Sequence, residues 1–258
     1  TKLATIVQLD PIYVEFNVSE QDVLKIRQNL NGRRLTVEEL GKRRPAIVYQ
    51  TTAYGQSGRE QLAKTFAELK APAVLEEGIA VTVNDLSPAL LRAKAANADV
   101  LIFHLHAAST VLAVRQARQS LPNLPIVTGS AMHQPATAAL LEPAELKGLC
   151  AETAASPVSA ATPAMRQFLD AYRAAYNGDP DAYAATQYDA VNMLARILAD
   201  KLASPAAVRD RLAKDEFKGV VTTYRSDGKG NMAHEAEIVC FDGTSRIPKV
   251  VERYSLSR

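Results

Sequence analysis

The sequence predicts an α/β protein built on a doubly wound parallel sheet, with helices on both faces. From residue 45 to about 148, short apolar strands alternate with amphipathic helices, an order typical of parallel strands joined by right-handed crossovers. Hydrophobic residues make up 47% of the 258 residues and charged residues 22%, which is ordinary for a globular protein. No apolar run approaches the roughly 20 residues that span a bilayer.

Residues 1–44 differ in pattern from the rest of the chain. Apolar and polar side chains alternate over residues 5–18, which predicts a half-exposed strand, and Pro11 limits that strand to an edge or a bend. A short helix is expected over residues 19–30, with Ser19 as its N-cap. We therefore treat 1–44 as a separate segment.

Four strands and three helices are expected to alternate in the segment 45–148. The strands are short and apolar, and each helix carries its apolar residues on one face. At the start of the second helix, Ser87 is a suitable N-cap and Pro88 fits the first helical position. The expected strands span 45–50, 72–77, 99–106 and 124–129, and the expected helices span 59–70, 87–97 and 109–121.

Beyond residue 148 the alternation stops. Helices are expected over 164–177 and 180–203, and Ser204-Pro205 starts a third. Strand-like runs follow, separated by Asp-Gly pairs at 227–228 and 242–243. Such pairs are strong signals of β-hairpins. The chain is thus predicted to consist of three parts, 1–44, 45–148 and 149–258, the last holding helices of an incomplete second lobe and C-terminal hairpins.

Composition narrows the classes of function. Thirty Lys and Arg face 28 Asp and Glu, so the concentrated basic face of a nucleic-acid-binding protein is not expected. The glycine-rich loops that hold dinucleotides or ATP are absent from the sequence, and no cofactor is predicted. Cys150 and Cys240 lack metal-ligand spacing, and the sequence leaves open whether they form a disulfide or stay two thiols.

Polar side chains follow three of the predicted strands at the point where each strand ends. Thr52 and Tyr54 follow the first, His104 and His106 close the third, and Ser130 follows the fourth. In an open parallel sheet, ligands sit outside the carboxyl ends of the strands. The sequence therefore predicts a pocket for a small polar or anionic molecule at this edge.

The same residues also fit a metal site or a nucleophile. His104 and His106 lie on the same side of a strand, as metal ligands can, but no third ligand is evident, and the two rings could equally pack at the strand end. The stretch Gly55-Gln56-Ser57-Gly58 is one residue short of a nucleophile elbow. Because no acid pair and no nucleophile–base set emerges, we expect binding without catalysis and no metal.

Residues 45–253 resemble the later portion of the branched-chain amino-acid type of periplasmic solute-binding protein of ABC transporters. The matching pieces, in the family's order and spacing, are AYGQSGREQLAKTF, DLSPALLRAKAANADVLIF, VRQARQSLPNLPIVTG and FLDAYRAAYNGDPDAYAATQYDAVNML, with FDG near the end. The resemblance implies two α/β lobes that close over a solute, a permease of the inner membrane as partner, a periplasmic location and no enzymatic activity.

The resemblance also implies roles for single residues. Tyr54 stands at the family's ligand-contacting Tyr-Gly position, and His106 falls where relatives often place an aromatic residue. Tyr183 matches the family's Pro-Asp-Ala-Tyr and is expected to border the cleft. Ser130 falls where amino-acid-binding relatives keep an acid, and the missing carboxylate favours carboxylates, aromatic acids or amides as ligands over α-amino acids.

A second resemblance covers residues 3–42, which are similar to the β-barrel segment of periplasmic adaptor proteins of RND-type efflux pumps. In solute-binding relatives most of the first lobe, with loops that grip the ligand, occupies this place. We therefore expect incomplete and weak solute binding. An adaptor or scaffolding protein of an efflux system is the alternative function.

Overall fold

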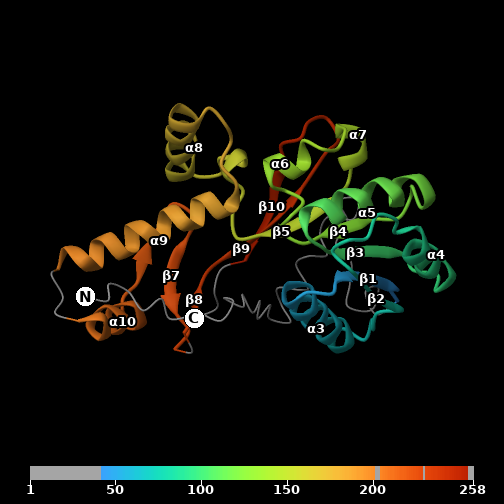
Figure 1. Cartoon of the computed structure of the whole chain (residues 1–258), viewed down its shortest axis with the longest axis horizontal. Helices are drawn as coiled ribbons and strands as arrows, with labels where there is room; N and C mark the ends of the chain where they lie inside the picture. Colours follow the sequence, from blue (N-terminus) through green and yellow to red (C-terminus); the bar gives the residue numbers. More distant parts are fainter. Residues whose placement is uncertain (1–41, 201–203, 229, 255–258) are drawn as a thin grey trace.

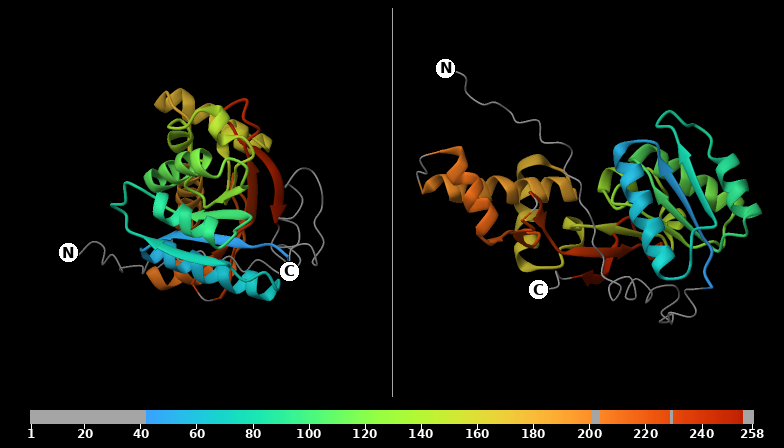
Figure 2. Two further views of the ribbon diagram at one scale, coloured as in Figure 1. Left: turned by 90° about the vertical axis from the view of Figure 1, so that its right-hand side faces the viewer. Right: turned by 90° about the horizontal axis from the view of Figure 1, so that it is seen from below.

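The computed structural model describes residues 42–200, 204–228 and 230–254, so the strand and helix predicted before residue 42 lie outside the described residues. These residues form a seven-stranded sheet and a three-stranded sheet. Figures 1 and 2 show the seven-stranded sheet with its helices at one end of an elongated molecule and a group of helices around the small sheet at the other. Among the described residues, no helix is both long and apolar enough to cross a membrane.

The large sheet confirms the predicted doubly wound α/β class. Its strand order is β10-β9-β5-β4-β3-β1-β2; the pairs from β2 to β5 are parallel, whereas β9 and β10 are antiparallel additions at the β5 edge. Its strands are β1 (Pro45–Gln50), β2 (Leu75–Ile79), β3 (Val100–His104), β4 (Ile126–Thr128), β5 (Cys150–Thr153), β9 (Ala236–Cys240) and β10 (Lys249–Tyr254).

Helices cover both faces of this sheet. On one face, Ile47 and Ile102 pack against Leu62 and Phe66 of α3 (Ala53–Glu68). The opposite face, which carries the larger core cluster, packs against α4 and α5 and the short helices after β4. The bounds of these helices are α4 (Ser87–Ala95), α5 (Ala107–Ser120), α6 (Pro135–Ala138) and α7 (Pro143–Leu146).

The remaining elements form the helical group, residues 157–233. Its small sheet has the order β6-β7-β8, and Met193 and Ile197 of α9 pack against Phe217 and Tyr224 of that sheet. The elements are η2 (Pro157–Ser159), α8 (Pro163–Tyr176), α9 (Ala182–Ala199), α10 (Pro205–Lys214), β6 (Phe217–Lys218), β7 (Thr223–Ser226) and β8 (Met232–Ala233). The hairpin turn predicted at 227–228 joins β7 to β8.

The sequence predicted a boundary between two parts of the chain at residue 148. In the structure this boundary falls between β4 and β5, which are neighbours in the large sheet. The chain leaves the sheet after β5, forms the helical group, and returns as β9 and β10. Cys150 of β5 and Cys240 of β9 face each other and form a disulfide. The structure thereby resolves the alternative that the sequence left open.

Candidate functional site

The carboxyl ends of the parallel strands face the helical group. β5 leads directly into η2 and α8, and β1, β3 and β4 run in the same direction as β5. The ends of these strands therefore lie at one edge of the sheet, between the two ends of the molecule (Figure 1). The residues that follow the strands stand at this edge. This is the edge at which the sequence predicted a pocket.

Tyr54 is placed by the start of α3. The helix begins at Ala53, six residues before the predicted start, because the Thr52 side chain caps it by accepting a hydrogen bond from the backbone N–H of Gly55. Tyr54 thus lies in the first turn. Its ring stacks on His104, with centroids 4.1 Å apart, and on His106, with centroids 5.2 Å apart.

The two histidines occupy different positions. His104 is the last residue of β3, whereas His106 is the N-cap of α5, so the predicted strand 99–106 ends earlier than expected. His106 is exposed, and its Nε2 lies 3.2 Å from the Thr52 hydroxyl oxygen. His104 is largely buried, and burial lowers its pKa to about 4. The His104 ring is consequently neutral near pH 7, and His106 is the imidazole open to solvent.

Two glycines make room for the aromatic stack. A Cβ at Gly58 would lie 2.2 Å from Nε2 of His104, and one at Gly129 would lie 2.5 Å from the Tyr54 hydroxyl. These distances are too short for any side chain at either position unless the rings move. Gly58 and Gly129 thus hold His104 and Tyr54 close to neighbouring backbone.

Glu152 is a site residue that sequence reasoning missed. Its Oε1 accepts a hydrogen bond of 3.1 Å from the backbone N–H of Ser130, so a carboxylate from β5 reaches the position where the sequence showed none. Burial raises its pKa to about 7. The sequence signal that could have identified Glu152 is that it is the one acid in the otherwise uncharged run 150–153.

Two buried polar atoms at this edge have no hydrogen bond of good geometry among the described residues. They are the Tyr54 hydroxyl oxygen and Oε2 of Glu152. Burial raises the pKa of Tyr54 above its ordinary value, Glu152 raises it further, and the Ser130 side chain acts in the opposite direction. Tyr54, Ser130 and Glu152 therefore form one polar cluster with spare hydrogen-bonding capacity.

The loop after β4 connects this cluster to the helical group. Gln134 donates a 3.1 Å hydrogen bond to the Ser130 carbonyl and accepts one of 3.1 Å from the backbone N–H of Ala182, the first residue of α9. The next residue, Tyr183, is 59% exposed and adds to the raised pKa of Tyr54. The structure thus brings Thr52, Tyr54, His106, Ser130 and Tyr183 to a single region.

His133, in the same loop, is completely buried. Its Nε2–H donates a 3.0 Å hydrogen bond to the carbonyl of Ala155, which lies two residues after the end of β5. Burial lowers the pKa of His133 to about 4, which keeps the ring neutral and its Nε2 proton in place near pH 7. The side chain therefore ties the β4 loop to the connection between the two ends of the molecule.

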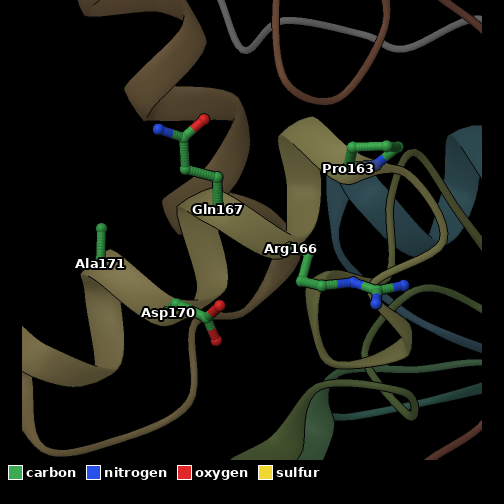
Figure 3. Close-up of a pocket in the computed structure, with 5 residues that line it drawn as sticks. All are labelled: Pro163, Arg166, Gln167, Asp170 and Ala171. Carbon is green, nitrogen blue, oxygen red and sulfur yellow. The ribbon is translucent and has the colours of Figure 1, made fainter.

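Within the described part of the chain, no three His, Cys, Asp or Glu side chains stand close enough together to hold a metal ion. A hollow of about 630 Å³ lies over one exposed face of α8, lined by residues at helical spacing (Figure 3). Its lining residues are Pro163, Arg166, Gln167, Asp170 and Ala171. None belongs to the polar cluster.

We expect Glu152→Gln to change how stability depends on pH. The folded pKa of about 7 lies above the ordinary value of 4.5, so as pH rises from 4.5 to 7 the unfolded state loses its proton first. The carboxyl group therefore costs the wild type up to about 3 kcal/mol across this window, whereas glutamine costs nothing there. Urea unfolding of both proteins at several pH values measures the difference. A stability gap that stays constant from pH 4.5 to 7 would contradict the assignment.

Comparisons with known proteins identify the family of the chain and its fold. The model of the periplasmic binding protein family matches residues 32–244, and the chain belongs to that family. No curated protein matches the chain. Nothing in these comparisons supports the resemblance of residues 3–42 to efflux adaptors, and the family match begins at residue 32, inside that segment.

Solved structures show the same fold. A substrate-binding protein of an ABC transporter from Sphaerobacter thermophilus is 19% identical, with a TM-score of 0.75 over 84% of this chain and 61% of its own. The branched-chain amino acid binding protein LivJ from Streptococcus pneumoniae, in complex with isoleucine, is 25% identical, with a TM-score of 0.67 over 83% and 62%. A solute-binding protein from R. palustris, in complex with benzoate, is 14% identical, with a TM-score of 0.72 over 84% and 61%. The chain spans about three-fifths of the length of these proteins.

Proposed function

We propose that this chain is the substrate-binding component of an ABC transporter and that it binds a small solute without transforming it. The observation that carries the proposal is the convergence of Thr52, Tyr54, His106, Ser130 and Tyr183 at the edge of the large sheet that faces the helical group. Side chains from both ends of the molecule border this region. A solute held there favours the arrangement in which the two ends close over it.

The chemistry of the cluster indicates the class of solute. The stacked rings of Tyr54 and His106 suit a planar or apolar portion of a solute. The Tyr54 hydroxyl and Glu152 Oε2, which lack a hydrogen bond of good geometry among the described residues, suit hydrogen-bonding groups. We propose amino acids, aromatic acids and related small carboxylates or amides as ligands. This range includes isoleucine and benzoate, the ligands present in two of the solved relatives.

Location, partner and affinity follow from the same proposal. We infer a periplasmic location, where a disulfide such as Cys150–Cys240 persists, and an inner-membrane permease as partner. We also infer weak solute binding, because His106 and Tyr183 at the site lie exposed to solvent. Submicromolar affinity for any tested solute would contradict weak binding. It would leave the proposed function, location and partner unaffected.

Tyr54→Ala is expected to abolish or weaken solute binding at least ~10-fold, because it removes the ring at the centre of the stack. A thermal-shift screen over amino acids and small carboxylates first identifies solutes that raise the melting temperature. Isothermal titration then compares wild type with Tyr54→Ala and with Tyr176→Ala. Tyr176 is an exposed tyrosine on α8, and its replacement should leave binding unchanged. Equal affinity for all three proteins would place the solute elsewhere.

A further inference from the structure

Glu152 belongs to the polar cluster and has no counter-ion there. Its pKa responds to burial, which raises it, and to the hydrogen bond from the backbone N–H of Ser130, which lowers it. No charged side chain in the described part of the chain adds to these two causes. A buried carboxyl group that lacks an opposite charge favours its neutral, protonated form.

The proton of the neutral group belongs on one particular oxygen. Oε1 of Glu152 accepts the 3.1 Å hydrogen bond from Ser130, and the carbonyl oxygen of a carboxylic acid is its better acceptor, so the proton resides on Oε2. Oε2 and the Tyr54 hydroxyl are the two buried atoms at this edge that lack a hydrogen bond of good geometry among the described residues. The neutral cluster therefore offers two O–H donors, which suit a solute group that accepts hydrogen bonds.

Two helix N-termini add to this preference. The helices α3 and α5 begin at Ala53 and Ala107, and their N-cap side chains touch, with the Thr52 hydroxyl oxygen 3.2 Å from Nε2 of His106. Neither helix has an acidic residue in its first turn. The positive ends of two helix dipoles thus meet beside Tyr54 and favour a negatively charged ligand.

We propose that Glu152 binds the carboxylate of a solute as a neutral acid, donating the proton on its Oε2 while Tyr54 donates its hydroxyl proton to the same carboxylate. This inference rests on the proposed function and narrows its ligands to solutes that present a carboxylate, rather than an ammonium group, to Glu152. An apolar site can keep a carboxylic acid neutral so that it donates a hydrogen bond.

Such binding is linked to protons. A second carboxylate beside Glu152 raises the pKa of Glu152 further. Above the pKa of the free protein, which is about 7, the complex therefore takes up a proton from solvent as it forms. The other titratable or charged side chains on the elements around Glu152 are Tyr54 of α3, His104 of β3, His106 of α5, His133 after β4, Tyr183 of α9, and Glu237 of β9 with its ion-pair partner Arg253 of β10.

Isothermal titration at several pH values tests the role of the proton. A thermal-shift screen first selects ligands from a panel of aliphatic and aromatic monocarboxylates and the matching primary amines. From about pH 7 to about pH 8.5, the affinity of the wild type for a selected carboxylate should fall at least ~10-fold, because Glu152 loses its proton. Glu152→Gln keeps the shape and a permanent N–H donor, and should lose at most ~2-fold. It also keeps every other titratable group, so any pH dependence that they cause remains in the variant.

Two further measurements complete the test. Titrations of the wild type in buffers of different ionisation enthalpy should show proton uptake, and this comparison does not depend on the folding of a variant. The matched control Glu68→Gln changes an exposed acid at the end of α3 and should behave as the wild type does.

The outcomes separate this inference from the proposed function. Equal pH dependence in wild type and Glu152→Gln overturns the inference alone. Tighter binding of amines than of carboxylates does the same, since Glu152 would then be a charged partner for ammonium groups. A wild type that binds no amino acid, carboxylate or amine at any pH overturns the proposed function, and the inference with it.

Discussion

Replacing Cys150 and Cys240 together by serine lowers the free energy of unfolding by about 4 kcal/mol. The disulfide closes a loop of 90 residues, and in the chain-entropy description a loop of that length restricts the unfolded state by roughly this amount. The two residues also face each other in neighbouring strands. The bond thus holds the returning segment, β9 and β10, against β5 after the chain has formed the helical group.

Urea unfolding of wild type and double variant, with and without reductant, measures the effect. Reductant should bring the wild type down to the stability of the serine variant and leave that variant unchanged. Hydrogen exchange should show the largest loss of protection in β9 and β10, since β5 is, among the described strands, their one contact with the parallel part of the sheet. A loss below about 1 kcal/mol would mean that packing alone holds β9 in place.

Four of the five parallel strands of the large sheet, β1 to β4, were predictable because their signals are local, whereas β5 was not expected. The run 45–50 is apolar up to its last residue, Gln50, and it forms β1 with the predicted bounds. Strands at the centre of a doubly wound sheet are buried on both faces, which gives them this unbroken apolar character. The α/β class and the direction of the strand ends followed from such runs and the helices between them.

The antiparallel edge of the sheet could not be predicted in the same way. β9 lies beside β5, although 82 residues separate Thr153 from Ala236. Nothing in a strand's own pattern states which distant strand it will pair with, because pairing depends on the packing of the whole fold. The sequence correctly indicated strands and hairpins there and left their place in the sheet open.

In the candidate site, too, some residues were predictable from local sequence signals, whereas others depend on the assembled fold. Tyr54 and His106 were predicted as site residues because each stands at the end of a recognisable strand, and the structure brings their rings together. Glu152 was missed because its importance arises from register: Thr128 of β4 pairs with Ala151 of β5, and this brings Glu152 to the backbone N–H of Ser130. A lone acid in a short strand normally points to solvent. Its burial is a property of the assembled sheet.

Asp189→Ala is expected to lower the free energy of unfolding by about 4 kcal/mol, an effect as large as that of removing the disulfide. Asp189, on the inner face of α9, is 4% exposed. It accepts hydrogen bonds from the backbone N–H groups of Val220 and Val221, at 2.7 and 2.9 Å, and from the hydroxyl of Tyr224 at 3.1 Å. Alanine leaves three donors without their acceptor, and hydrogen bonds to a charged group count more than neutral ones.

Two graded variants separate this network from general packing. Tyr224→Phe removes one donor and keeps the carboxylate, so it should cost about 1 kcal/mol. Asp189→Asn keeps the shape and one acceptor oxygen and should fall between the other two. Urea unfolding ranks all three. If Asp189→Ala cost no more than Tyr224→Phe, the carboxylate would not be what fixes the 219–221 loop to α9, and the packing of Met193 and Ile197 against Phe217 would have to hold the helical group together alone.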